Sequence, residues 1–289
     1  MNSKKFYLVT DASIICSYLV SKWVDAFGNM PEFQGVIVKE EPQSQNVLKA
    51  RQDFHNRYFD LNNFIVDSPQ KIADLSQEIA DLYPSFDQTE KSMITNYGVA
   101  KYSVTGYDKT FCLGDNLNGN NVKEWLIEVS EKSSTFIFVC ATQILKSWWI
   151  ELTNSQVFNC HSAVLPFARG MYAIENIAIQ ENVSEFKKAA GTTIHYIDEG
   201  VDTGKIIRAQ RIMNPFQFDS IWDLKAYSYL LGFDLYVKTA QDILADSETI
   251  QVGISPNPEL LGPNFLIKDF TPEKQRQAEQ SYLSMKNSL

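Results

Sequence analysis

The sequence has few cysteines and few histidines, and neither residue type forms a pattern that binds a metal. Four cysteines are scattered through the 289 residues without a C-x-x-C pair, and there are only three histidines. Cys16, Cys112 and Cys140 lie among apolar residues, which is typical of buried thiols in a reducing compartment. No histidine spacing resembles H-E-x-x-H. We therefore expect reduced cysteines and no metal site.

Long apolar runs and clusters of basic residues are absent too. No run reaches the length of a membrane span. The apolar part of the opening segment is broken by Thr10, Asp11 and Ser13, which favours a first strand over a signal peptide. The net charge of −9 disfavours an extended nucleic-acid surface. With 44% hydrophobic residues the chain can bury a full core, so we expect a folded, cytosolic protein without a membrane or nucleic-acid partner.

Predicted strands and helices alternate along the chain. Strands are predicted from KKFYLVT, FQGVIVKE, TFCLG, TFIFVCA, SQVFNCH, AAGTTIHYID and GKIIRAQRI. Helices are predicted for ASIICSYLVSKWVDAF and NNVKEWLIEVSEKSS. A third helix is predicted to end with the residues ENIAIQENV. This alternation predicts an α/β, doubly wound, Rossmann-like fold with a mostly parallel sheet, in which ligands bind at the carboxyl ends of strands.

We expect residues 1–210 to form the core and residues 211–289 to pack on it as C-terminal helices and an extension. Residues 40–110 are a partly unassigned insertion. Two of its segments look helical, NVLKARQDFHNRYFDLNN and SPQKIADLSQEIADLY, the second with a cap at Ser68 and Pro69 in its first turn, whereas EKSMITNYGVAKYSVTGY has no clear period. Near the end, FQFDSIWDLKAYSYLLGFDLYVKTAQDILAD is helical, GISPNPELLGPNF predicts a linker or strapped loop, and a polar helix follows from Thr271.

Two segments at predicted strand ends carry groups suited to catalysis. The first is NCHSAVLPFARG, in which alternation places Asn159 and His161 on the same side of a strand. The second is TTIHYIDEGVDTGKII, in which a glycine-containing loop after His195 carries Asp202. Each segment alone is also compatible with a capped or solvated loop. Together they suit a site where an amide and an oriented imidazole stabilise a tetrahedral intermediate.

These two segments resemble motifs of the formyltransferases that use 10-formyltetrahydrofolate and act on glycinamide ribonucleotide, methionyl-tRNA or sugar nucleotides. The family form of the first motif is N-x-H-P-S-x-L-P-x-x-x-G, and the second contains T-x-H followed by D-x-G-x-I-I. The positions in register are Asn159, His161, Leu165, Pro166, Gly170, Thr193, His195, Asp202, Gly204, Ile206 and Ile207. Clear resemblance covers about residues 111–210, and the opening strand–helix–strand agrees more weakly.

The resemblance implies that Asn159, His161 and Asp202 are the catalytic trio. Asn159 and His161 would hold the oxyanion that develops when a primary amine attacks the formyl carbon. Asp202 would orient His161 and keep it charged, and the trio would relay the amine proton to the folate nitrogen. His195 would support the loop from the strand below. No metal is required.

The resemblance also implies where the co-substrate 10-formyltetrahydrofolate binds. The backbone at Ala141, Gln143 and Leu145 would contact its pterin ring. The loop that contains Glu199, Gly200 and Val201 would form the opposite wall.

The chain departs from the family pattern at two places. Ser162 and Ala163 replace the proline and serine that follow the catalytic histidine. The turn VTDAS has no glycine, where glycinamide ribonucleotide formyltransferases carry a glycine-rich phosphate loop. Asp11 in that turn would repel a phosphate but could pair with an ammonium group or a sugar hydroxyl.

The predicted function is an N-formyltransferase that acts on a primary amine of a small metabolite, either an amino-sugar nucleotide or a modified amino acid. One alternative is hydrolysis of 10-formyltetrahydrofolate, although such hydrolases usually carry a regulatory domain for which there is no room before Lys4. The other is a non-catalytic folate-binding protein, against which the intact trio argues. A homodimer is left open as the assembly.

Overall fold

In the computed structural model, which describes residues 4–59, 69–132, 134–245 and 252–289, the chain divides into an N-terminal unit of residues 1–157 and a C-terminal unit of residues 158–289. No helix in these described ranges is long and apolar enough to cross a membrane. The sequence analysis placed a different boundary at residue 210, between a core and a C-terminal extension, and that boundary stays a prediction.

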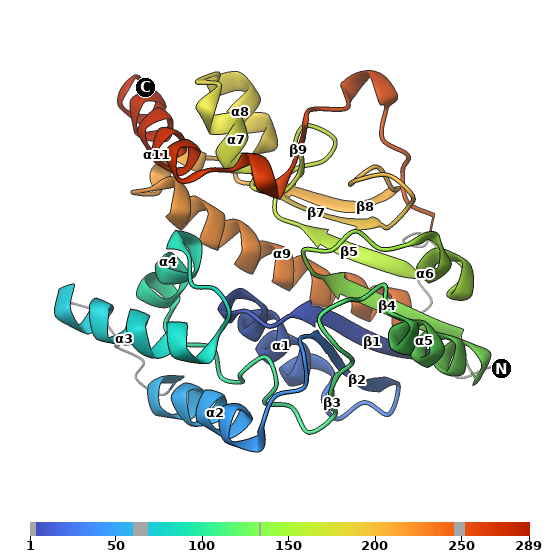
Figure 1. The fold of residues 1–289 in the computed structure, drawn as a ribbon. Coiled ribbons are helices and arrows are strands. Elements are labelled where there is room, and N and C mark those ends of the chain that lie inside the picture. The colour runs from blue at the N-terminus through green and yellow to red at the C-terminus, as the bar shows by residue number, and fades with distance from the viewer. Residues whose placement is uncertain (1–3, 60–68, 133, 246–251) are drawn as a thin grey trace. The chain divides into compact units, whose positions relative to one another are not determined.

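A parallel sheet forms the centre of the N-terminal unit (Figure 1). The strand order is β3-β2-β1-β4, and each neighbouring pair is parallel. The elements are β1 (Lys4–Asp11), α1 (Ile14–Phe27), β2 (Phe33–Lys39), α2 (Gln45–Phe59), α3 (Pro69–Leu82), α4 (Gln88–Tyr97), β3 (Thr110–Cys112), α5 (Asn120–Lys132), β4 (Ser134–Cys140) and α6 (Ser147–Leu152). The predicted α/β fold with a parallel sheet is confirmed here.

The apolar runs of the central strands are continuous because both faces of this sheet are buried. Phe6, Leu8 and Val9 of β1 have no exposed surface. Phe6 stacks on Phe33 of β2 and meets Trp23 of α1 edge to face, with ring centroids 5.3 and 6.3 Å apart. The apolar face of α1 thus closes one side of the sheet.

The insertion contains a helix that the hydrophobic period does not reveal. The aperiodic segment forms α4, which Asp87 and Glu90 begin with a reciprocal capping box. Its polar residues Thr89 and Glu90 are buried together with Met93, so apolar spacing could not indicate the helix. The D-x-x-E spacing of Asp87 and Glu90 could have predicted the start of this helix. The helices predicted for α2 and α3 are confirmed within the described residues, and the Ser68 cap lies outside them.

A buried polar network joins the insertion to the sheet of the N-terminal unit. Arg51 of α2 donates to both carboxylate oxygens of Glu40 at 2.6 and 2.7 Å, and its Nε donates to the Leu82 carbonyl. His55 lies between the Ala100 carbonyl and the Tyr83 hydroxyl, 2.6 and 2.7 Å away. Burial lowers the pKa of His55 to about 4. The insertion is therefore fixed to the strand ends by paired and hydrogen-bonded groups.

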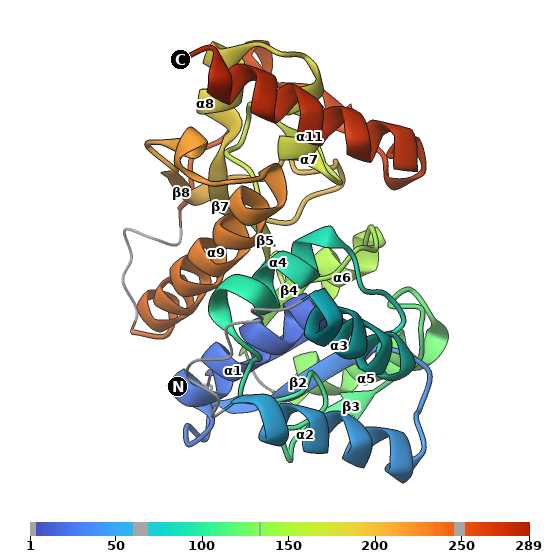
Figure 2. The same ribbon diagram turned by 90° about the vertical axis from the view of Figure 1, so that its left-hand side faces the viewer.

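An antiparallel ladder of β5, β7 and β8 forms the centre of the C-terminal unit. Helix α9 packs along β7, and α7 lies between α8 and α11 (Figure 2). The elements are β5 (Val157–His161), β6 (Arg169–Gly170), α7 (Ala173–Ile179), α8 (Val183–Ala189), β7 (Gly191–Tyr196), β8 (Ile206–Arg211), η1 (Pro215–Gln217), α9 (Ile221–Leu244), η2 (Pro258–Leu260), β9 (Asn264–Phe265), η3 (Ile267–Asp269) and α11 (Pro272–Asn287).

Two predictions for this unit can be compared with the structure. The segment ENIAIQENV does not close one helix, because α7 ends at Ile179 and the Asn182 side chain caps α8. The Pro- and Gly-rich segment is a strapped loop, in which β9 pairs with β6. Thr271 caps α11 as predicted.

We predict that Phe186→Ala destabilises the protein by about 3–5 kcal/mol, because it removes a fully buried ring from the cluster that also contains Phe216 and Tyr282. Guanidinium chloride unfolding followed by circular dichroism measures the change. Met213→Ala is the control, since Met213 is 89% exposed and its loss should change stability by less than about 0.5 kcal/mol. Equal effects of the two substitutions would contradict this assignment of the core.

Candidate active site

The ends of β5 and β7 bring the predicted trio together in the C-terminal unit. The antiparallel register pairs Asn159 with His195 and His161 with Thr193. Paired residues project from the same face of a ladder, so Asn159 Nδ2 lies 3.2 Å from His195 Nε2. Asp202 enters from the loop between β7 and β8.

Asp202 is the centre of this cluster. One carboxylate oxygen, Oδ1, lies 3.4 Å from His195 Nε2, and the other, Oδ2, lies 3.6 Å from His161 Nδ1. The Gly170 N–H donates to Oδ2 at 2.7 Å. Asp202 itself has a left-handed backbone with φ 51°, a conformation that aspartate tolerates better than most residues. Asn159, His161 and Asp202 are thus neighbours, and His195 joins them.

Backbone carbonyls fix the tautomers of both imidazoles. His161 Nε2 lies 2.9 Å from the Ala168 carbonyl, and His195 Nδ1 lies 2.8 Å from the Tyr196 carbonyl. A carbonyl only accepts, so these two nitrogens carry the protons in the neutral rings. His195 Nε2 then accepts from Asn159, and His161 Nδ1 faces Asp202 without a proton.

The ionisation of the cluster follows from its burial. Burial lowers the pKa of His161, and this effect outweighs the opposing charge of Asp202. Burial alone would raise the pKa of Asp202, but His161, His195 and the Gly170 N–H outweigh it and hold that pKa well below its ordinary value. Burial thus favours a neutral His161 beside an ionised Asp202. The expectation that Asp202 keeps His161 charged runs against this direction, and the titration of His161 tests it.

Two threonines of β7 hold the segment after His161 in place. The Thr192 hydroxyl donates to the His161 carbonyl at 3.0 Å. The Thr193 hydroxyl donates to the Ala163 carbonyl and accepts the Leu165 N–H, both at 2.9 Å. The threonine that matches the second motif thus anchors the first motif.

The residues predicted to contact folate lie on two loops, one in each unit. Ala141, Gln143 and Leu145 follow β4 in the N-terminal unit. Glu199, Gly200 and Val201 precede Asp202 in the C-terminal unit, where the Gly200 N–H donates to Asp198 at 3.1 Å. The folate site itself stays a prediction.

Asparagines that the sequence analysis did not single out hold the first of these loops. Gln143 accepts the Leu117 N–H at 2.8 Å and donates to Asn116 at 2.6 Å. Asn118 donates to the Ile144 carbonyl and accepts the Lys146 N–H, both at 2.9 Å. The side chain of Gln143 is therefore committed to the scaffold. The segment NLNGNN, which is rich in residues that form turns, could have indicated these asparagines.

Asp11 is already paired within the N-terminal unit. Its carboxylate lies 3.3 Å from Lys39 Nζ and accepts the Thr142 N–H at 2.7 Å. The charge that we expected to face an ammonium group or a sugar hydroxyl therefore has two partners from the chain itself. Asp11 links β1, β2 and the loop after β4.

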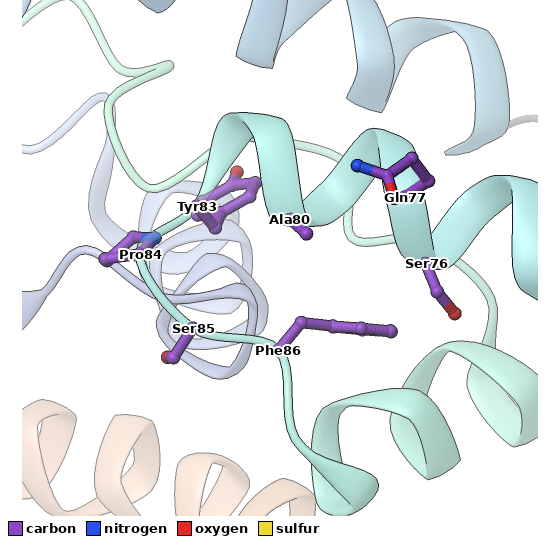
Figure 3. A pocket seen from close by; sticks show the side chains of 7 residues that line it. All are labelled: Ser76, Gln77, Ala80, Tyr83, Pro84, Ser85 and Phe86. Carbon is purple, nitrogen blue, oxygen red and sulfur yellow. The ribbon is translucent and has the colours of Figure 1, made fainter.

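Outside this cluster the described residues contain a buried ion pair of Lys225 and Glu175, 3.2 Å apart, and a hollow in the N-terminal unit. A hollow of about 500 Å³ lies against α3 and the turn that follows it, with Tyr83 and Phe86 on its wall (Figure 3). The Tyr83 hydroxyl is occupied by His55 and Ser17. Among the described residues there is no group of three or more His, Cys, Asp or Glu side chains that could hold a metal ion.

Comparison with known proteins identifies the family. A sequence model of the formyl transferase family matches residues 63–220, which is more than half of the chain. The chain belongs to this family.

Its curated relatives differ in substrate. The methionyl-tRNA formyltransferase of Halothermothrix orenii is 32% identical over 130 residues, which are 45% of this chain and 38% of that protein. The phosphoribosylglycinamide formyltransferase of Bacillus subtilis is 30% identical over 95 residues, 33% of this chain and 46% of that protein. The formyl transferase chain described here thus matches less than half the length of either relative.

A solved structure shows the same fold over nearly the whole chain. It is the N-formyltransferase of Helicobacter canadensis in complex with folinic acid and dTDP-3-aminofucose. The TM-score is 0.53 at 16% sequence identity, with 98% of this chain and 81% of that chain covered. The likeness establishes a formyltransferase fold.

We predict that imidazole NMR finds His161 neutral at neutral pH, with the proton on Nε2 and a titration midpoint below the ordinary pKa of 6.5. Because the folded pKa is lowered, the unfolded chain binds more protons below 6.5, and the contribution of His161 to stability falls as the pH drops through that value. His161→Gln assigns the signal. A midpoint above 6.5 would show that Asp202, and not burial, controls this ring.

Proposed function

We propose that this chain is an N-formyltransferase that moves a formyl group from 10-formyltetrahydrofolate to a primary amine of a small metabolite. The observation that carries the proposal is the cluster of Asn159, His161 and Asp202 at adjacent strand ends, with tautomers fixed by the backbone. Family membership supplies the reaction class, since formyl transfer is the common chemistry of the relatives.

Asn159 supplies the hydrogen bond that catalysis of acyl transfer requires. One N–H of its amide is directed to His195 Nε2. The second N–H donates to the formyl oxygen as negative charge develops there during attack of the amine. A fixed donor of this kind stabilises the transition state more than the ground state.

His161 and Asp202 move the proton. The bond between the amine nitrogen and the formyl carbon forms as the amine proton passes to His161 Nδ1, the unprotonated nitrogen that faces Asp202. The carboxylate stabilises the imidazolium that results. His161 then gives the proton to the folate nitrogen as its bond to the formyl carbon breaks, so the trio returns to its resting state.

The co-substrate fits the predicted loops by their chemistry. The loop after β4 is held by side-chain bonds of Asn116, Asn118 and Gln143, which leaves a fixed backbone at Gln143 and Leu145 for a pterin ring. Glu199, Gly200 and Val201 adjoin Asp202 and supply the second set of contacts. The Helicobacter canadensis structure was solved with folinic acid, a formylated folate, which supports this co-substrate class.

The acceptor is an amine on an amino-sugar nucleotide or a modified amino acid. The turn between β1 and α1 uses two of its N–H groups within the chain, since the Ser13 N–H bonds the Asp11 carbonyl and the Cys16 N–H bonds the Ser13 hydroxyl. The Asp11 carboxylate at this turn is paired with Lys39 and the Thr142 N–H, and as an acceptor it offers no hydrogen bond to a phosphate. The amino sugar nucleotide in the Helicobacter canadensis complex is an acceptor of the kind proposed.

We predict that alanine at any member of the trio lowers kcat while the fold is kept. Asn159→Ala should cost about 100–1000-fold, the effect of losing one oxyanion donor. His161→Ala and Asp202→Ala should each cost about 100–10,000-fold, because proton transfer is lost. Steady-state kinetics at saturating substrates measures these effects.

Asp219→Ala is the control for the trio, since the Asp219 side chain is fully exposed. It should leave kcat unchanged. Near-normal turnover by His161→Ala would exclude the proton transfer assigned to that ring.

We predict that glycinamide ribonucleotide is a poor acceptor and that an amino-sugar nucleotide or an amino-acid amine is formylated instead. Hydrogen bonds to a charged group contribute about 1.5–3 kcal/mol each. Loss of the phosphate-binding turn should therefore lower kcat/KM for glycinamide ribonucleotide at least about tenfold. An assay with pure enzyme, 10-formyltetrahydrofolate and each amine measures the ratio.

The same assay without amine tests the hydrolase alternative. Formate release at the rate of formyl transfer would favour hydrolysis. Efficient formylation of glycinamide ribonucleotide would overturn the assignment of the acceptor class and leave the trio untouched.

A further inference from the structure

The segment from Ile254 to Phe265, called the strap below, is bonded to both loops of the candidate site. At its start, Ile254 exchanges two backbone hydrogen bonds of 2.8 Å with Ile206, which follows the Asp202 loop. At its end, the Pro263 carbonyl accepts the Arg169 N–H at 3.1 Å, and the Phe265 carbonyl accepts the Met171 N–H at 2.9 Å. The strap therefore spans from one site loop to the other.

The loop that the strap holds also carries the two main-chain groups that define the site. The Ala168 carbonyl fixes the tautomer of His161, and the Gly170 N–H bonds Asp202. Arg169 lies between these residues, and the strap pairs with its backbone. A displacement of the strap would move both main-chain groups at once.

Arg169 joins three segments with one side chain. Its Nε donates to the Gly262 carbonyl of the strap at 3.1 Å, and its Nη1 donates to the Val201 carbonyl at 3.3 Å. Val201 precedes Asp202 in the loop predicted to contact folate. The rigid planar fork of arginine can reach both carbonyls in a fixed geometry, which the single ammonium group of lysine cannot do.

The contact between strap and loop leaves no room for side chains. A Cβ on Gly262 would lie 1.8 Å from the Phe167 carbonyl oxygen, and a Cβ on Gly170 would lie 2.1 Å from the Phe265 carbonyl oxygen. Gly170 also has φ 81°, which glycine adopts readily. Both glycines are required for the backbones to approach closely enough to bond.

We propose that the strap and Arg169 form a positioning device for the catalytic centre, in which Arg169 is a positioning residue that ties the His161 loop to the Asp202 loop. This inference rests on the proposed function for its kinetic consequence. The arrangement of the imidazoles is a separate consequence that can be measured without any substrate.

The kinetic test compares Arg169→Lys with Arg276→Gln, a substitution of an exposed arginine on α11 of the same unit. Arg169→Lys should lower kcat about 100-fold, as expected for a small misplacement of reacting groups, with a smaller effect on the KM of the amine. Arg276→Gln should behave as the unsubstituted enzyme. A kcat for Arg169→Lys within twofold of that control would overturn the proposal.

The second test measures the titration midpoints of the imidazoles by NMR. The measurement is practical because the chain has only three histidines. Arg169→Lys should shift the titration midpoint of His161. The charged groups that act on this ring are Asp202, His195 and Lys225, and the substitution changes none of them. Arg276→Gln should leave the midpoint in place, and an unshifted midpoint in Arg169→Lys would refute the positioning role.

Gly262→Ala disturbs the strap without altering Arg169, and it should shift the His161 midpoint in the same direction. Met213→Ala is its control, since Met213 lies outside the strap and is 89% exposed. If one of the two test variants fails to fold, the other decides. A shifted midpoint in an enzyme that formylates no amine would refute the proposed function and support the positioning device.

Discussion

The burial of one carboxylate between two imidazoles is the constraint on which the C-terminal unit depends. Asp202 is only 12% exposed by its side chain. A buried carboxylate is costly unless hydrogen bonds and charges compensate it. The Gly170 N–H donates to this carboxylate whatever the state of the rings, and His161 and His195 add compensation when their facing nitrogens carry a proton. These three groups lie on three different segments. Those segments must be held in register for the carboxylate to remain ionised, and the ladder of β5 and β7, Arg169 and the strap all serve that end.

Main-chain groups determine much of the chemistry of this site. The Ala168 and Tyr196 carbonyls select the tautomers of the two imidazoles, and neither effect depends on the side chain of those residues. The Gly170 N–H binds Asp202 in the same way. The loop with Ser162 and Ala163, which replace the proline and serine of the family motif, is held by Thr193 and the strap.

In the N-terminal unit, too, hydrogen bonds within the chain fix the loops at the strand ends. In the turn between β1 and α1, the Asp11 carbonyl accepts the Ser13 N–H and the Ser13 hydroxyl accepts the Cys16 N–H. Asp11 is neutralised by Lys39 and fixes the loop after β4 through Thr142.

From the sequence alone we could predict the family, the parallel strands and most helices, because periodicity, caps and the two motifs depend on neighbouring residues. The two motifs also predicted a catalytic trio of Asn159, His161 and Asp202, and these residues are neighbours in the structure. The sequence analysis missed α4, whose buried face is partly polar, and did not separate α7 from α8. Only the tertiary structure showed that burial lowers the pKa of His161, that Asp11 is already paired, and that the strap is bonded to both site loops. Each of these depends on burial or on contacts between residues far apart in the chain, such as Arg169 and Gly262, which no local pattern records.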